Sequence, residues 1–434
     1  MLKYQNIDSV NINRLNLLLI RGLKIVFFLM PAIGLAQIPS PGDIYKEYSR
    51  TMGQTNKNWR VTGEEVKRPD AREFLPNDIL QLEINDLQGA VKAEAIIDRW
   101  GGHTGTLNKK IRFNNNEWIS LPELTTTPAG EKPESYCYQD NPVVPIPLAY
   151  LHEGVNTFEG ACNTPGHFWP QWGWVGIIIR VYYNASKPHP TGRIISPVVG
   201  DILTENPLII AEAKSKTGIE RIDILAYYNG YDENGDGIYK DWHCQYWCLR
   251  NAEKIDISGH VGTIRQVPYE VKWNATLIPD QEKDSIKLVA RIKGKDGTWY
   301  VTDVIDGLTL KREDYSVQMY TASDVPPEFS VRNYSAKSCK IRISPEADLQ
   351  NAVEAWFCLR TWNGFAAFHE PFLINNWPDV FQGNNHNFDM DVTPIHLMAI
   401  RPGDNIISYY SKTIDHMAEI LWPGPAFIIR YQNK

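Results

Sequence analysis

Histidine and tyrosine side chains suited to proton transfer occur on polar loops between short apolar segments. His103 follows a glycine pair, His260 follows a single glycine, and Tyr138 lies in a Tyr-Cys-Tyr-Gln-Asp-Asn run. His386 and His416 lie on two loops near the C-terminus. A positioned histidine or tyrosine can take up and return a proton near neutral pH. These five residues are the catalytic candidates, although a single histidine such as His103 is also common as a turn-stabilising residue.

A second group of residues has the chemistry of sugar binding. Trp169 and Trp174 lie in a loop with the sequence His-Phe-Trp-Pro-Gln-Trp-Gly-Trp, and exposed tryptophans stack on the faces of pyranose rings. We expect at least one of the two to be exposed at a site. Asn385, Arg265 and His243 are polar loop residues that can bind sugar hydroxyls or carboxylates. The alternative for the loop around His243 is a segment packed against a neighbouring domain.

The acidic segment 232–241 has the spacing of a calcium-binding loop. Asp232, Asn234 and Asp236 place oxygen atoms at alternating positions, and Asp241 lies downstream. Calcium prefers oxygen ligands, and the glycine after the third of them permits a sharp turn. The twelfth position is histidine rather than the glutamate of an EF-hand, so the alternative is an acidic hairpin turn without a metal. Phosphate-binding glycine loops and dinucleotide fingerprints are missing from the sequence, and we expect no organic cofactor.

The first 36 residues have the features of an export signal. Basic residues precede an apolar run, 25–35, and Gly-Leu-Ala stands before residue 37. This run is about half as long as a helix that crosses a membrane. We therefore expect cleavage after Ala36, a periplasmic or secreted protein, and no integral membrane segment.

The net charge of the chain limits the classes of partner that it can bind. It has 44 Lys and Arg residues against 51 Asp and Glu residues, a net charge of −7. Removing residues 1–36 takes away four basic residues and one acidic residue, a net +3, and leaves a charge of about −10. The remaining sequence has no basic run of the kind that binds nucleic acids or anionic membranes. An anionic sugar would therefore need a local basic or metal-lined pocket.

Six cysteines in an exported chain can form disulfides. The pairs that the sequence suggests are Cys137–Cys162, Cys244–Cys248 and Cys339–Cys358, the last with two buried thiols as the alternative.

The apolar segments are short and typical of β-strands. Gly, Pro, Asn and Asp separate them at roughly ten-residue intervals, as in β-sandwiches. The periodicity of long amphipathic helices is missing, and we expect at most a short helix within residues 41–52. The predicted class is all-β.

Two regions, one near each end of the chain, carry the same series of residues. The offset between them is 249 from Leu148 to Asn156 and 250 at Arg180, and such a constant register indicates two diverged copies of one domain. His386 and His416 lie on loops comparable to those of Tyr138 and Trp169, so we expect the two histidines to meet at one end of the second copy. The alternative is two unrelated surface histidines. Corresponding residues are Trp100/Trp362, Asn114/Asn375, Leu148/Leu397, Gly154/Gly403, Asn156/Asn405, Trp172/Trp422 and Arg180/Arg430.

Each repeated block has a structural role. Asn-Asn and Gly-x-Asn are typical of tight turns with positive φ, and the final apolar run is typical of a strand buried on both faces. The series resembles the galactose-binding-like jelly roll of sugar-binding domains in glycoside hydrolases, where an Asn-Gly hairpin, a Val-Pro-Leu strand and a Leu-x-x-Gly-x-Asn turn recur in that order. The resemblance implies a jelly-roll sandwich at each end of the chain. It does not distinguish binding from catalysis.

The middle of the chain differs from both ends. After a linker at 186–191, strand-like segments such as 222–228 and 285–292 predict an immunoglobulin- or fibronectin-like sandwich. The predicted organisation is a signal peptide (1–36), a jelly roll (37–188), an immunoglobulin-like sandwich (189–322) and a second jelly roll (323–434).

This organisation resembles that of exported proteins of marine polysaccharide degradation of the ulvan type, including the oligosaccharide dehydratases of ulvan breakdown. The resemblance implies a lyase that forms an unsaturated uronic acid at the non-reducing end of an oligosaccharide. Such an elimination needs a base, a group that holds the carboxylate, and an acid. No catalytic motif matches residue by residue, so no family site is carried over. The predicted partner is a uronate-containing oligosaccharide or polysaccharide; the alternatives are a non-catalytic carbohydrate-binding protein and a structural module without a ligand.

Overall fold

The computed structural model describes residues 38–434 except 250–251, 365–371, 380–385, 415 and 434. The predicted export signal therefore lies outside the described residues. The described residues form one compact unit. Strands dominate the described chain, confirming the all-β class, and no helix in it is long and apolar enough to cross a membrane. Its helical turns are α1 (Ala71–Phe74), η1 (Met52–Gln54), η2 (Pro133–Ser135), η3 (Leu148–Tyr150), η4 (Leu349–Asn351) and η5 (Leu397–Ala399).

The first sandwich packs a four-stranded sheet against one end of a 13-stranded sheet. Its central strand, β10, is buried along its whole length, as expected for a strand covered on both faces. The four strands are β3 (Leu80–Ile84), β9 (Gly154–Ala161), β5 (Lys110–Phe113) and β6 (Ile119–Ser120), and the facing strands are β1 (Ile44–Thr51), β2 (Arg60–Thr62), β4 (Ala90–Trp100), β7 (Gln139–Asp140), β8 (Val143–Ile146) and β10 (Gln171–Tyr183).

The second sandwich repeats this plan with a four-stranded and a six-stranded sheet around one core. The four strands are β25 (Ser335–Ile343), β30 (Gly403–Ser411), β27 (Phe372–Ile374) and β28 (Trp377–Asp379), and the six are β23 (Tyr315–Thr321), β24 (Ser330–Val331), β26 (Ala352–Asn363), β29 (Phe388–Ile395), β31 (Ala418–Ile420) and β32 (Ala426–Gln432).

The middle segment forms a third sandwich with its own core. A hairpin of two strands is inserted within the same segment, at residues 245–258. The strands of one layer are β11 (Thr191–Ser196), β13 (Leu208–Lys214) and β19 (Glu270–Lys272), those of the other are β12 (Ile202–Leu203), β14 (Ile219–Asn229), β15 (Lys240–His243), β18 (Gly262–Ile264), β20 (Ile286–Gly294), β21 (Thr298–Val301) and β22 (Ile305–Leu310), and the hairpin is β16 (Gln245–Trp247) with β17 (Asp256–Ser258).

Strand β1 joins the first sandwich to the middle one. It pairs with β10 on one side and with β21 on the other, so one sheet continues across both. The expected helix at 41–52 is wrong, because most of this segment is β1. Backbone pairing on two sides outweighs the weak helical preference of so short a segment. This sheet crosses the predicted boundary near 188, and the core of the second sandwich includes Leu124, Tyr136 and Tyr138 from the first predicted range, so the domain boundaries stay a prediction.

The duplicated turns have matching hydrogen bonds in the two copies. Asn114 Nδ2 donates to Asn156 Oδ1 at 2.7 Å, and Asn375 Nδ2 donates to Asn405 Oδ1 at 3.0 Å. Asn114 and Asn375 have φ of 49° and 57°, and Gly154 has φ of 99°, so the predicted left-handed turns are confirmed. The repeat in the sequence is therefore a repeat of turn geometry.

All six cysteines are buried free thiols, so the predicted disulfides are not formed. Cys244 and Cys248 flank strand β16, and an extended chain separates residues four apart by about 13 Å, too far for a disulfide. Cys339 belongs to the core of the second sandwich, whereas Cys358 belongs to a different cluster. Cys137 and Cys162 also have separate surroundings, since Cys162 lies in the first core and the carbonyl of Cys137 accepts from the backbone of Trp422.

Candidate functional site

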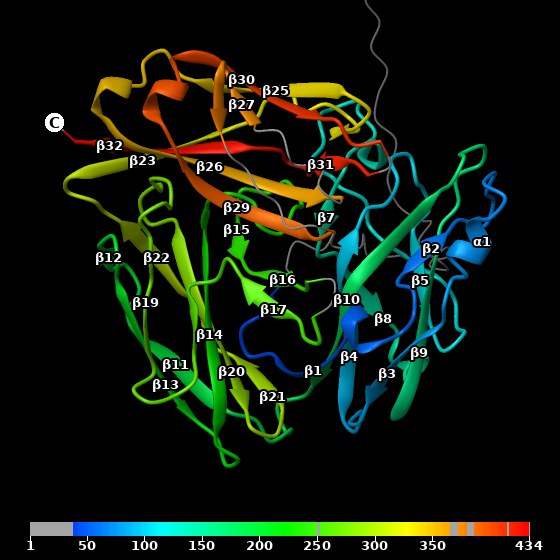
Figure 1. The fold of residues 1–434 in the computed structure, drawn as a ribbon. Helices are drawn as coiled ribbons and strands as arrows, with labels where there is room; N and C mark the ends of the chain where they lie inside the picture. The colour runs from blue at the N-terminus through cyan, green and yellow to red at the C-terminus, as the bar shows by residue number, and fades with distance from the viewer. Residues whose placement is uncertain (1–37, 250–251, 365–371, 380–385, 415, 434) are drawn as a thin grey trace, which may run out of the picture. The chain divides into compact units, whose positions relative to one another are not determined.

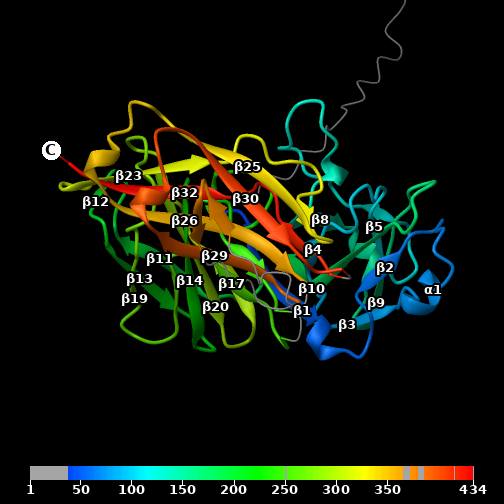
Figure 2. The same ribbon diagram turned by 45° about the horizontal axis from the view of Figure 1, so that its top comes forward.

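Two histidines meet at the end of strand β26, as expected from the sequence. Strands β29 and β31 both pair with β26 at Trp362, and His386 and His416 stand two residues before these strands. The imidazole ring centroids lie 5.1 Å apart with an edge-to-face orientation. In Figures 1 and 2, the ends of β26 and β29 reach the region of β4 and β10 in the first sandwich.

Trp362 and Glu419 extend this pair along the sheet. They are directly opposite each other on β26 and β31, so their side chains project from the same face. The Trp362 ring lies 5.7 Å from the His386 ring. Gly364 lies two residues after Trp362 in the sequence. A Cβ atom on Gly364 would meet the Trp362 ring at 2.7 Å and His416 at 2.9 Å. Only glycine permits the chain to pass at this point.

Glu419 is a buried carboxyl group facing the first sandwich. It is 7 % exposed, and its Oε2 atom has no hydrogen-bond partner among the described residues. Burial raises the pKa of Glu419 to about 7, against the lowering effects of a hydrogen bond from the Trp100 side chain and of the Arg60 charge. Glu419 therefore holds its proton in part at neutral pH.

The first sandwich contributes a connected row of polar and aromatic side chains. Arg60 Nε donates to Gln171 Oε1 at 3.0 Å, and the guanidinium lies 5.4 Å from the Trp100 ring centroid. Gln171 Nε2 lies 2.8 Å from His103 Nε2, and His103 Nδ1 lies 3.0 Å from the carbonyl oxygen of Trp169. A carbonyl can only accept, so these contacts assign the proton to Nδ1 and leave Nε2 as the acceptor from Gln171.

His103 is thereby kept neutral. Burial, helped by the charges of Arg60 and Arg332, lowers its pKa to about 4 against the raising effect of the hydrogen bond to Trp169. Both ring nitrogens have partners, and the ring packs edge-on against Trp100 with centroids 5.9 Å apart. His103 is suited to hold Gln171, and through it Arg60, in place.

We call this group the junction site, because it joins the first sandwich to the second. Sequence reasoning named three of its members as catalytic candidates and missed Arg60, Gln171 and Glu419. Trp100 and Trp362 were recognisable, since they are repeat counterparts at the ends of β4 and β26. The junction site consists of Arg60, Trp100, His103, Gln171, Trp362, His386, His416 and Glu419.

Comparisons with known proteins gave only remote structural likenesses. No family model and no curated protein matches the chain. Fibronectin(III)-like modules of Clostridium thermocellum CbhA have a TM-score of 0.18 and 15 % identity, covering 56 % of this chain and 86 % of theirs. A β-porphyranase of glycoside hydrolase family 86 from the human gut bacterium Bacteroides plebeius has a TM-score of 0.22 and 10 % identity, covering 59 % of this chain and 38 % of its own. BuGH86 in complex with neoagarooctaose has a TM-score of 0.23 and 10 % identity, covering 63 % of this chain and 41 % of its own.

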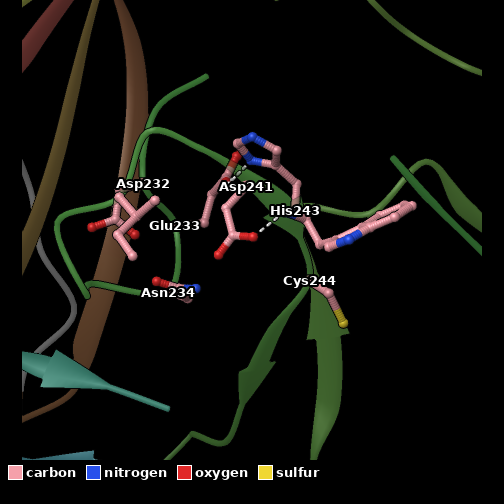
Figure 3. Close-up of a pocket in the computed structure, with 8 residues that line it drawn as sticks. Asp232, Glu233, Asn234, Asp241, His243 and Cys244 are labelled. Carbon is pink, nitrogen blue, oxygen red and sulfur yellow. Dashed lines mark hydrogen bonds and ion pairs between the residues drawn. The ribbon is translucent and has the colours of Figure 1, made fainter. Parts of the chain in front are cut away.

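The predicted calcium ligands lie on a tight loop and on β15. Asp232, Asn234 and Asp241 line a small pocket that Figure 3 shows, and Asp236 is not among its lining residues. Each of the predicted ligands already accepts a backbone hydrogen bond. The Asp232 carboxylate accepts from the N–H groups of Gly235 and Gly237, both at 2.7 Å. The side chains of Asn234, Asp236 and Asp241 accept from the N–H groups of residues 236, 238 and 242.

These contacts are sufficient for an acidic turn without a metal. In the described part of the chain no group of three or more His, Cys, Asp or Glu side chains is arranged to hold a metal ion. Burial raises the pKa of both Asp232 and Asp236, and their mutual repulsion contributes at Asp236. The calcium site therefore stays a prediction, and no chemical step is assigned to it.

His243 belongs to the same loop and is not placed as a sugar ligand. Its side chain is buried, stacks on Tyr228 with centroids 3.7 Å apart, and pairs with Glu233 at 2.5 Å. Burial alone would lower its pKa, but the Glu233 carboxylate reverses the effect and the pKa is raised. The loop around His243 is therefore a packed segment, which was the alternative to a sugar-binding loop.

The expected exposure of Trp169 or Trp174 is wrong. The two side chains are 8 % and 3 % exposed. Trp174 belongs to the first core, and Trp169 is covered by Arg68, whose guanidinium lies 4.0 Å from its ring centroid. The alternating pattern of β10 turns Trp172 and Trp174 into the core, which loop composition alone did not reveal.

Three other candidates are not members of the junction site. Tyr138 is 1 % exposed and donates to Glu123 Oε2 at 2.7 Å, so it belongs to the core. His260 Nε2 lies 2.9 Å from Thr263 Oγ1, and burial lowers its pKa to about 4. Arg265 is exposed on the middle sandwich. Asn385 lies outside the described residues.

Proposed function

We propose that this protein is a carbohydrate-active lyase that removes water from uronate-containing oligosaccharides, with the junction site as its active site. The observation that carries the proposal is Glu419, a buried carboxyl group that burial holds at a pKa of about 7 and on which the Arg60 charge acts. A carboxyl group that keeps its proton near neutral pH can act as an acid. A guanidinium is suited to bind the carboxylate of a uronate.

The proposed reaction is an elimination. A base takes the proton from the carbon next to the substrate carboxylate, and the electron pair of that C–H bond forms a C=C bond. The C–O bond on the neighbouring carbon breaks, and the departing hydroxyl takes up a proton and leaves as water. Atoms and electrons balance without an oxidant or a reductant. Negative charge builds on the carboxylate during proton removal, so a fixed cation beside it lowers the barrier.

The junction site offers one side chain for each task. Arg60 would hold the carboxylate, His386 or His416 would take the proton, and Glu419 would protonate the departing oxygen. His103 would act as a positioning residue, because its ring nitrogens are engaged by Trp169 and Gln171.

The test is direct. Purified full-length protein is incubated with oligosaccharides that carry a uronic acid at the non-reducing end, and the ultraviolet absorbance of unsaturated uronate is followed together with the product mass. We expect rising absorbance and the loss of one water from the substrate. Retained saccharide binding without new absorbance would reject the elimination.

A non-catalytic carbohydrate-binding protein is the second candidate. It is favoured by two exposed phenylalanines, Phe74 and Phe168, on the first sandwich, since exposed aromatic side chains serve as sugar platforms. Under this function, calorimetry detects saccharide binding while the absorbance stays flat.

A further inference from the structure

Two exposed aromatic side chains lie on connected segments of the first sandwich. Phe74 is 56 % exposed and Phe168 is 63 % exposed. Among the described residues, Tyr334 is the one other exposed aromatic side chain of comparable degree, at 66 %. Single exposed apolar residues are ordinary, but two phenylalanines on connected segments need an explanation.

The backbone holds these segments together. The N–H groups of Lys67 and Arg68 both donate to the carbonyl oxygen of Phe168 at 3.0 Å. Phe74 ends the short helix α1, and its ring packs edge-on against Trp169 with centroids 5.8 Å apart. Trp169 in turn donates from Nε1 to Thr62 Oγ1 at 3.2 Å. A surface held in this way loses little conformational entropy when a ligand binds.

A planar polar pair borders the aromatic rings. Arg68 lies over the Trp169 ring and 5.7 Å from the Phe74 ring centroid. Its Nε and Nη2 atoms donate to the two carboxylate oxygens of Asp70 at 2.5 and 2.8 Å. Aromatic faces beside fixed polar groups suit a pyranose ring, which has apolar C–H faces and polar hydroxyl edges.

Packed aromatic rings connect this surface to the junction site. The Trp169 ring lies 5.4 Å from the His103 ring, and His103 lies 5.9 Å from Trp100. Arg68 lies over Trp169 in this surface and Arg60 lies by Trp100 in the junction site, so each of the two places holds a cation in a chain of net charge −7. The two cations and the connecting rings therefore favour one anionic ligand that reaches from the junction site to the aromatic surface.

We propose that Arg68, Phe74 and Phe168 form an accessory subsite that stacks a further pyranose unit of the acidic oligosaccharide bound at the junction site. The inference rests on the proposed function and specifies it, since it makes the substrate an oligosaccharide rather than a single sugar. The sugar unit in this subsite undergoes no reaction.

The test compares the full-length wild type with the double variant Phe74→Ala/Phe168→Ala on a uronate-containing disaccharide and hexasaccharide. Losing aromatic stacking weakens binding about tenfold. We expect KM and the calorimetric Kd to rise about tenfold for the hexasaccharide and much less for the disaccharide, with kcat similar to wild type. Val199→Ala, at a residue that is 63 % exposed on the middle sandwich, is the matched control.

The outcomes separate this inference from the proposed function. A loss that is the same for both lengths, or no loss, overturns the subsite even when turnover is normal. If the wild type binds saccharides but shows no turnover, the lyase function fails and the Kd comparison still decides the subsite. Failure of the wild type to bind either saccharide overturns both. A change in oligomeric state, seen by size-exclusion chromatography with unchanged saccharide affinity, assigns the surface to contact between copies and overturns the subsite as well.

Discussion

The imidazole rings of His386 and His416 lie with their centroids 5.1 Å apart, although 29 residues separate them in the sequence. Strands β29 and β31 create this proximity by pairing with the same end of β26. Glu419 lies on β31 at the same end of β26, opposite Trp362, and receives a hydrogen bond from Trp100 of the first sandwich. Neighbouring strands thus bring together two histidines that can act as a base and one buried carboxyl group that can act as an acid.

The first prediction concerns the two histidines. Replacing the proposed base by alanine removes proton abstraction, which contributes about 10²- to 10⁴-fold to a rate. We expect either His386→Ala or His416→Ala to lower kcat by about 10²-fold or more without changing the melting temperature by more than a few degrees. His152→Ala, at an exposed histidine of the first sandwich, should retain wild-type kcat. Parallel losses of kcat and melting temperature would assign a packing role instead.

Glu419 should make stability depend on pH. Its pKa of about 7 in the folded protein lies above the value of an unfolded glutamate, about 4.3, because burial disfavours the charged form. The folded state then binds more protons between these values, so the free energy of unfolding is highest below pH 4 and falls as the pH rises through 7. The loss amounts to roughly 2–4 kcal/mol.

Denaturant titrations at pH 5 and pH 8 measure this effect. Glu419→Gln carries no charge, so the variant should lose less stability than wild type between the two pH values. Glu313→Gln, at an exposed position, should behave as wild type. Identical pH dependence in Glu419→Gln and wild type would contradict a buried, proton-holding carboxyl group.

The duplicated turns should depend on their buried asparagines. Asn405 is 0 % exposed and donates to the carbonyl oxygens of Arg401 and Gly403. Asn405→Ala removes these bonds together with those that Asn405 Oδ1 accepts from the Arg401 N–H and from Asn375 Nδ2, which costs about 3 kcal/mol in the free energy of unfolding. The exposed Asn376 is the matched control, and Asn376→Ala should cost less than about 0.5 kcal/mol. Equal costs would show that Asn405 is not needed for the turn.

Tyr246 should hold together the first and middle sandwiches. Its hydroxyl oxygen accepts from Arg180 Nη2 at 2.6 Å and from Arg291 Nη1 at 2.5 Å, and both arginines are buried. Tyr246→Phe removes one acceptor from each guanidinium and should cost about 3 kcal/mol by chemical denaturation. Tyr45→Phe is a close control, because the buried Tyr45 hydroxyl has no hydrogen-bond partner in the described structure. Its loss should be neutral or slightly stabilising.

The predicted calcium loop is tested by a chelator. Calcium that binds only the folded state stabilises it, by more as free calcium exceeds its Kd, so EDTA should lower the melting temperature of wild type and have no effect on Asp236→Ala. An unchanged melting temperature after EDTA treatment would leave the hydrogen-bonded turn as the whole role of Asp232 and its neighbours.

The sequence alone determined the strands, the turns and the duplication. These features rest on local chemistry: alternating apolar residues define a strand, and Asn114 and Gly154 are residue types that adopt positive φ at low cost. The spacing of the repeat then placed His386 and His416 on neighbouring loops. Strand and turn preferences depend on residues close together in the sequence. The position of the two histidines could be predicted because the constant spacing of the repeat aligns the second copy with the first.

Only the tertiary structure decided which side chains share a site. Glu419 and Trp100 come from different sandwiches, and no local pattern records that they meet. Burial likewise depends on packing between distant segments, which is why Trp169 and Trp174 are covered and why strand β1 replaced the expected helix. A pKa such as that of Glu419 follows from the same packing, because the cost of a buried charge is set by all the groups around it.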